Sequence, residues 1–284
     1  MLRTLQTPPP VALSIAGSDN SAGAGIQADL KTFTSLGAYG LTAVTCVVAE
    51  VPGQVNAIAT IPPEVVAEQV RLSFVAFPVA ALKTGMLHSR AVIAAVVDTL
   101  AQLRSEKRGE PFPALVVDPV MVATSGAALL EPDAVEAYRT DLLPQATLVT
   151  PNLDEAAVLA GRPLDSAQAM EEAGHELCAR YGTAFLLKGG HLKGEQALDL
   201  LITPDGRVET FSGPRVEGVA THGTGCTFSA AITAGLARGL SLSEAVALGK
   251  RFVSASIAAT WRWQRPEGMT TDALCHTACR EEPC

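Results

Sequence analysis

The sequence predicts an α/β protein in which a central, mostly parallel sheet is covered by helices on both faces. Short apolar and β-branched runs alternate along the chain with amphipathic stretches, and this alternation is typical of parallel sheets. The 284 residues are 48% hydrophobic and 18% charged, so the chain can bury a large core. No linker or low-complexity segment divides the chain, and we expect a single domain over residues 1–284 with a small β flap.

The elements are expected in strand–helix order. A buried strand over residues 11–16 leads through a glycine-rich loop into a helix over 25–36, and a second strand follows over 42–48. Residues 50–62 place Pro52-Gly53 between alternating apolar residues, which indicates a flap hairpin. Further strands are expected over residues 79–83, 115–118, 147–150 and 184–188. Further helices are expected over residues 63–77, 89–103, 133–142, 153–160 and 166–180.

The last third of the chain predicts a different arrangement. Apolar runs over residues 198–203 and 208–212 flank the turn sequence PDGR, which predicts an antiparallel hairpin. Two helices, over 224–238 and 242–261, then close the core. We expect this core to span about residues 11–261, with residues 1–10 and 265–284 as tails.

Charge and apolar patterning exclude several classes of protein. The formal net charge is −8 and no basic cluster occurs, which argues against nucleic-acid binding. No run approaches the ~18 apolar residues of a membrane span, and the N-terminal run lacks a signal-peptide cleavage site. Six scattered cysteines fit reduced thiols better than a disulfide framework. We therefore expect a soluble, cytoplasmic protein.

The C-terminal segment concentrates possible metal ligands. Cys275, His276, Cys279 and Cys284 lie close together in the sequence. Their spacing matches no standard zinc site, so an ordinary terminus is the simpler interpretation. The role of this segment stays open at this point.

A glycine-rich loop follows the first strand in AGSDNSAGAGIQADLKTF. Gly17, Gly23 and Gly25 permit tight turns and the close approach of a ligand, and Asp29 lies early in the helix that follows. The loop lacks the terminal Gly-Lys-Ser/Thr of a P-loop. Ligand binding and a simple strand-to-helix turn remain equal alternatives.

Polar residues follow three later strands. Asp118 ends one strand, Asn152 and Glu155 begin the helix after the next, and Lys188 ends a third. Carboxylate and amide oxygens suit Mg²⁺, although Asn152 and Glu155 also fit a helix capping box. Lys188 is placed to reach a phosphate or to lie on the surface. Ligands of such folds collect at the carboxyl ends of the strands, so these residues should meet.

The segment THGTGCTFSAA combines a glycine turn with the start of a helix. Such a turn directs backbone N–H groups and the positive end of the helix dipole at an anion. Cys226 stands where a carboxylate base would be the obvious choice. Two acids, an amide, a lysine and an anion-binding turn together suit phosphoryl transfer, in which catalysis is mostly positioning and charge neutralisation.

Six segments in this order are similar to those of a known enzyme family. AGSDNSAGAGIQADLKTFTSLGAYG, KTGML, DPVM, TPNLDEA, KGGH and HGTGCT resemble hydroxymethylpyrimidine and phosphomethylpyrimidine kinases of the thiamine pathway, in the ribokinase-like superfamily. The resemblance covers about residues 11–261. It implies the three-layer ribokinase-like fold, ATP and Mg²⁺ as cofactors, a small pyrimidine as substrate and usually a homodimer.

The same resemblance assigns roles to individual residues. Cys226 would accept the hydroxyl proton, with Lys188 and the backbone of Gly223, Thr224 and Gly225 holding the transferring phosphoryl group. A helix N-terminus and nearby Mg²⁺ or lysine would favour its thiolate form. The pyrimidine pocket would comprise Gly17, Ala24, Asp29, Val48, Glu50, Met86 and Val120. ATP would be bound by Lys188, Thr224 and Lys250, and the metal by Asp118, Asn152 and Glu155.

Glu50 departs from the family pattern, in which most members have glutamine. An aminopyrimidine edge offers an amino donor beside a ring-nitrogen acceptor, whereas an ionised carboxylate only accepts. Glu50 could be protonated, the ring nitrogen could be protonated, or Glu50 could face solvent. A pyridoxal or pyridoxine kinase is the alternative function, since that ring offers two possible donors. A catalytically silent binding protein would be expected to have lost the anion turn or the acidic pair, and both are intact.

Overall fold

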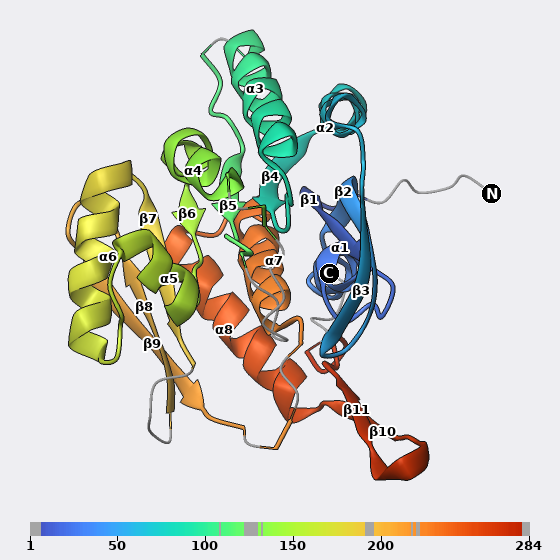
Figure 1. Cartoon of the computed structure of the whole chain (residues 1–284). Coiled ribbons are helices and arrows are strands. Elements are labelled where there is room, and N and C mark those ends of the chain that lie inside the picture. Colours follow the sequence, from blue (N-terminus) through green and yellow to red (C-terminus); the bar gives the residue numbers. More distant parts are fainter. Residues whose placement is uncertain are drawn as a thin grey trace.

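A nine-stranded sheet forms the centre of the protein (Figure 1). The computed structural model describes residues 7–107, 109–121, 130–131, 133–190, 196–216, 218–219 and 222–279. The strand order is β3-β2-β1-β4-β5-β6-β7-β8-β9. The strands are β1 (Val11–Asp19), β2 (Tyr39–Val51), β3 (Gln54–Thr60), β4 (Val79–Thr84), β5 (Ala114–Val117), β6 (Leu148–Val149), β7 (Ala184–Gly189), β8 (Gln196–Ile202) and β9 (Val208–Pro214).

The sheet is parallel in its centre and antiparallel at both edges. β2, β1, β4, β5, β6 and β7 pair in parallel. The flap β2–β3 and the hairpin β7–β8–β9 are antiparallel. The predictions of a mostly parallel sheet, a flap and a late hairpin are therefore confirmed. The chain changes direction across the sheet at β1 and β4, where ligands of such folds commonly bind.

Helices cover both faces of the sheet (Figure 1). One core cluster joins the sheet to α2, α3, α5 and α6, and two others join it to α1, α7 and α8. None of the helices in the described part of the chain is long and apolar enough to cross a membrane. The helices are α1 (Gly25–Ser35), α2 (Pro63–Ala76), α3 (Arg90–Glu106), α4 (Ala134–Ala137), α5 (Leu153–Ala160), α6 (Ala167–Tyr181), α7 (Thr224–Ala237) and α8 (Leu242–Ala258).

The two faces of the sheet follow the two-residue period of its strands. Leu13 and Ile15 of β1 pack on the α2–α3 side, whereas Ala12 packs on the α7 side. Leu82 and Ala81 of β4 divide in the same way. Small residues on the second face leave room for α7, which is buried along most of its length. Gly225, in the first turn of α7, lies beside Lys188 and Asp118, so this helix begins at the carboxyl ends of the strands.

The C-terminal segment differs from the expected tail. α8 ends at Ala258 rather than at residue 261, and β10 (Trp261–Gln264) and β11 (Thr270–Ala273) form a projecting hairpin (Figure 1). Leu274, Cys275 and His276 are buried, because this segment packs back onto α8 and α7. The Cys275 N–H donates to the Ser256 carbonyl at 3.1 Å. The prediction of a tail is wrong as far as residue 279, and Cys284 lies outside the described residues.

One predicted helix is also irregular. The segment expected as a helix over 133–142 contains only the short α4, followed by a π-helical turn (Tyr138–Leu142) and a 3₁₀ turn (Leu143–Gln145). The Tyr138 hydroxyl donates to the Gly85 carbonyl at 3.1 Å, and its ring is fully buried. This inward tyrosine accompanies the change in helical winding, which amphipathic periodicity does not reveal.

Candidate active site

The polar residues predicted at the strand ends meet at the carboxyl edge of the sheet. Lys188 Nζ lies 3.0 Å from Asp118 Oδ1, and Asn152 forms a parallel bridge with Lys188. A Cβ atom added to Gly225 would lie 3.3 Å from Lys188 Nζ and 3.6 Å from Asp118 Oδ2. The structure therefore brings the predicted acid, the lysine and the glycine turn together.

Asp118 and Lys188 form a charged pair. Asp118 is buried, and the Thr150 and Ser229 hydroxyls each donate to it at 3.2 Å. Burial alone would raise the pKa of Asp118, but Lys188, Lys83 and these hydrogen bonds hold it below its usual value. Burial would lower the pKa of Lys188, and the neighbouring carboxylates raise it instead. Both groups are therefore ionised at neutral pH.

Asn152 and Glu155 form the capping box that was one of the two alternatives. The Asn152 side chain accepts from the Glu155 N–H at 2.9 Å, and the Glu155 carboxylate accepts from the Asn152 N–H at 2.8 Å. Burial raises the pKa of Glu155 to about 7, with the charge of Lys188 opposing this rise. The Asp118 carboxylate also raises the pKa of Glu155, and two neighbouring carboxylates of this kind are oxygen donors that fit a partly hydrated Mg²⁺.

Two glycine-rich segments touch backbone to backbone beside this site. Gly223 precedes α7 with a φ of +80°, and a Cβ atom there would lie 1.8 Å from the Gly23 carbonyl oxygen. A Cβ atom on Gly23 would lie 2.7 Å from the His222 ring. The glycine-rich loop after β1 is therefore more than a turn, because it packs against the segment that begins α7.

Replacement of Gly223 by alanine is expected to abolish most activity and lower stability by more than about 1–3 kcal/mol. The new Cβ atom would both occupy the left-handed region and strike the Gly23 carbonyl. Gly239→Ala is the matched control, because Gly239 has a φ of +84° but open space around its Cβ position. Urea unfolding and turnover of both variants check this. Equal losses in both would contradict a role for the packed loops.

Cys226 lies in the first turn of α7, where the Gly25 N–H hydrogen-bonds to it. Burial raises the pKa of its thiol to about 11, and the opposing effects of Lys83 and the Gly25 N–H are smaller. Without a bound cation the thiol is therefore neutral at pH 7, and the thiolate favoured by Mg²⁺ stays a prediction. The sequence indicated that Cys226 lies at a helix N-terminus, but it did not show how far burial would desolvate the thiol.

A buried ion pair lies beside Cys226. Lys83 Nζ is 2.6 Å from Asp29 Oδ1, and both side chains are 0% exposed. The Ser14 hydroxyl donates to the other Asp29 oxygen at 2.5 Å. The structure thus places Asp29 in the interior with Lys83. Lys83 begins the segment KTGML, but the sequence analysis assigned it no role, because nothing local shows that it pairs with Asp29.

Four of the predicted pocket residues come together in an apolar wall. Val48 and Met86 cluster with Cys46, and Val120 packs against them. A Cβ atom on Gly17 would lie 2.8 Å from the Cys46 sulfur, so only glycine fits there without a shift. Val55 and Ile58 of the flap strand β3 also pack against this wall.

Three titratable groups at the rim were not predicted as a set. One ligand atom each of Asp19, Glu50 and His222 lies within 4.8 Å of the others. Asp19 also accepts from the N–H of the predicted pocket residue Ala24 at 2.8 Å. Asp19 and His222 lie in the glycine-rich motifs of the sequence, but 203 positions separate them, so only the fold reveals their contact.

Lys250, the predicted ATP ligand on α8, is engaged with strand β8. Its Nζ lies 2.7 Å from Asp199 Oδ2 and donates to the Ala197 carbonyl at 2.9 Å. The Gly189 N–H donates to the second Asp199 oxygen at 3.1 Å. Lys250 is therefore linked through Asp199 to the end of β7, where Lys188 also lies.

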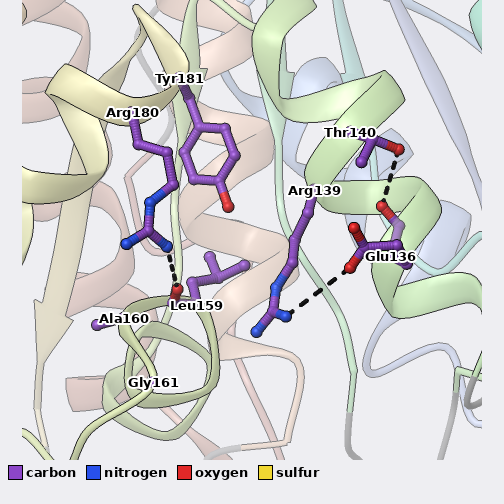
Figure 2. A pocket seen from close by; sticks show the side chains of 8 residues that line it. All are labelled: Glu136, Arg139, Thr140, Leu159, Ala160, Gly161, Arg180 and Tyr181. Carbon is purple, nitrogen blue, oxygen red and sulfur yellow. Dashed lines mark hydrogen bonds and ion pairs between the residues drawn. The ribbon is translucent and has the colours of Figure 1, made fainter.

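A surface pocket of about 390 Å³ lies at the other end of α5 from Asn152 (Figure 2). Arg180 donates to the Leu159 carbonyl at 3.1 Å, and Arg139 donates to the Val158 carbonyl at 2.5 Å. These arginines satisfy carbonyls of the last helical turn, which is a structural role. None of the predicted site residues lines this pocket.

Comparisons with known proteins identify the relatives of the chain. The family model for phosphomethylpyrimidine kinase matches residues 19–271. A hydroxymethylpyrimidine/phosphomethylpyrimidine kinase of Rhizobium meliloti is 48% identical over 259 residues, which cover 91% of this chain and 94% of the relative. The Escherichia coli protein of the same name is 42% identical over 87% of this chain and 90% of its own.

Solved structures share the fold over most of their length. A Bacillus subtilis pyridoxal kinase, in complex with ADP, has a TM-score of 0.83 and 35% identity, covering 95% of this chain and 98% of its own. A phosphomethylpyrimidine kinase of Clostridium difficile has a TM-score of 0.74 and 36% identity, covering 86% of this chain and 97% of its own. The three-layer α/β prediction is thereby confirmed.

Proposed function

Because this chain belongs to the phosphomethylpyrimidine kinase family, it is a phosphotransferase, and we propose that it acts in thiamine biosynthesis. Its substrates would be 4-amino-5-hydroxymethyl-2-methylpyrimidine and then the monophosphate of that compound, with ATP as the donor. The observation that supports this proposal best is that Cys226 lies in the first turn of α7, beside the Asp118–Lys188 pair. An apolar wall for a flat ring lies at the same edge of the sheet.

The geometry supports a division of labour for the first phosphorylation. The wall of Val48, Met86 and Val120 would hold the ring, and Cys226 would accept the proton of the hydroxyl as it attacks. Lys188 and the backbone N–H groups at the start of α7 would hold the charge of the transferring phosphoryl group. In the second phosphorylation the attacking phosphate oxygen is already ionised, so a proton acceptor is less important.

ATP and Mg²⁺ are the cofactors that we propose. A Staphylococcus aureus pyridoxal kinase of the same fold, 34% identical, has been solved with an ATP analogue, AMP-PCP. Asp118 and Glu155 would hold the metal, with Asn152 fixing the start of α5, and Mg²⁺ would neutralise phosphate charge when bound. Lys188, Thr224 and Lys250 stay the proposed nucleotide contacts. A homodimer and a cytoplasmic location stay predictions.

Pyridoxal kinase activity is less well supported. The chain is 48% and 42% identical to two pyrimidine kinases, against 35% and 34% to two pyridoxal kinases. The deciding experiment measures ATP turnover with Mg²⁺ on the hydroxymethylpyrimidine, its monophosphate and pyridoxal in parallel. We expect both pyrimidines to be phosphorylated faster than pyridoxal. Dominant turnover of pyridoxal would refute the proposed substrate.

A further inference from the structure

Glu50 is held in a fixed place at the rim of the apolar wall. It follows Val48 by two residues on β2, so the two side chains point to the same side of the strand. Its backbone N–H donates to Asn20 Oδ1 at 2.7 Å, which ties the flap to the loop after β1. Its carboxyl group lies within 4.8 Å of ligand atoms of Asp19 and His222. The backbone of Glu50 is therefore anchored, and its carboxyl group has Asp19 and His222 as close neighbours.

Asp19 is the ionised member of this cluster. Besides Ala24, it accepts from the Ser21 N–H at 2.6 Å, the Ser21 hydroxyl at 2.9 Å and His222 Nε2 at 3.1 Å. Burial would raise the pKa of Asp19, but these hydrogen bonds hold it well below its usual value. The hydrogen bond between His222 and Asp19 in turn raises the pKa of His222. The imidazole of His222 is therefore hydrogen-bonded to Asp19.

Glu50 is the second carboxyl group of the cluster, and His222 is the cluster's one basic group. The charged groups that face it are Asp19 from β1 and His222 from the segment before α7. Its other titratable neighbour, Cys46 of β2, has a thiol pKa raised by burial and is neutral. Val55 faces Glu50 from β3. Burial and the Asp19 carboxylate raise the pKa of Glu50, and only His222 opposes them.

We propose that Glu50, half-buried beside the Asp19 carboxylate, reads the aminopyrimidine ring as a neutral carboxylic acid. This inference rests on the proposed function. The Glu50 hydroxyl donates to the ring nitrogen, and its carbonyl oxygen accepts from the amino group. A protonated carboxyl group presents the same donor and acceptor as a carboxamide. Glu50 is thus a specificity-determining residue, and Asp19 and His222 are positioning residues that act through it.

The substitution Glu50→Gln tests the proposal because it fixes the neutral donor–acceptor pair at every pH. For the wild type, KM for the hydroxymethylpyrimidine should rise about tenfold per pH unit above the pKa of Glu50, because only the neutral acid binds the ring. For Glu50→Gln, KM should stay nearly flat and equal the low-pH value of the wild type. The matched control is Glu64→Gln, at an exposed glutamate of α2, which should follow the wild-type profile.

Calorimetry adds a readout that is independent of turnover. Binding titrations in buffers of different ionisation enthalpy should show proton uptake by the wild type above the Glu50 pKa and none by Glu50→Gln. A tenfold or greater loss of affinity in Glu50→Gln at neutral pH would overturn the proposal, since it would show that a carboxylate binds a protonated ring. Parallel pH profiles for the two proteins would overturn it as well.

Failure of this inference can be told apart from failure of the proposed function. If both proteins phosphorylate the pyrimidines with the same pH dependence, only the role of Glu50 fails. If both prefer pyridoxal, the proposed substrate fails and the inference about the aminopyrimidine edge fails with it.

Discussion

Replacement of Cys226 by alanine is expected to lower kcat for the hydroxymethylpyrimidine by about 10²–10⁴-fold, the usual contribution of a general base. The loss for the monophosphate should be much smaller, because its attacking oxygen carries no proton that must be removed. Steady-state turnover of the two substrates by the same preparation measures this difference. The selectivity between the two steps is the informative quantity, since misfolding would reduce both.

Cys279→Ala is the matched control for this experiment. Cys279 is another free and partly exposed thiol, but it packs beside a core cluster away from the strand ends. Its replacement should leave the ratio of the two activities unchanged. An equal loss of both activities in Cys226→Ala would contradict the role of Cys226 as proton acceptor in the first step.

The thiol pKa can be measured separately. Because burial raises the pKa of Cys226 to about 11, its reactive thiolate form should become about tenfold more abundant per pH unit from pH 7 to pH 10. In the protein without ATP, the rate at which Cys226 is alkylated should rise in the same way. Cys226→Ala identifies this part of the reaction, because the variant lacks it. A plateau near pH 8 would show that Lys83 and the Gly25 N–H outweigh burial.

Replacement of Lys83 by methionine is expected to destabilise the protein by about 3–5 kcal/mol, because it leaves the Asp29 charge buried without its partner. Both side chains are fully buried and the ion pair is 2.6 Å long. The double variant Lys83→Met, Asp29→Asn removes both charges and should recover most of this loss. Urea unfolding of the two variants gives the comparison.

A surface ion pair provides the control for Lys83. Arg71 and Glu68 on α2 also approach to 2.6 Å, but their side chains are about half exposed. Arg71→Met should therefore leave the unfolding midpoint nearly unchanged. If the double variant is as unstable as Lys83→Met alone, the cost arises from lost packing rather than from the unpaired Asp29 charge.

The sequence predicted the central layers well because their periodicities are local. Alternation at two residues marked the strands, and the rule that ligands gather at strand ends placed Asp118, Asn152 and Lys188 together. The flap and the late hairpin were marked by Pro52-Gly53 and PDGR. These signals lie within a few residues and do not depend on the rest of the chain.

What the sequence did not predict depends on contacts between distant segments. Lys83 pairs with Asp29, 54 residues earlier, so no local pattern reveals this ion pair. The raised pKa of Cys226 reflects desolvation, which exists only after the core has formed. The buried His276 contacts Thr227 at 3.0 Å, which explains why the C-terminal segment is ordered although its sequence resembles a tail.

The contact between the loop after β1 and the segment before α7 also constrains how the protein is made. Asp19 and Gly23 are synthesised about two hundred residues before His222 and Gly223. The loop therefore cannot take its final form on a growing chain until the segment before α7 has been synthesised. Such non-local closure is slow, so the last part of the molecule to mature during synthesis should be the catalytic edge rather than the sheet.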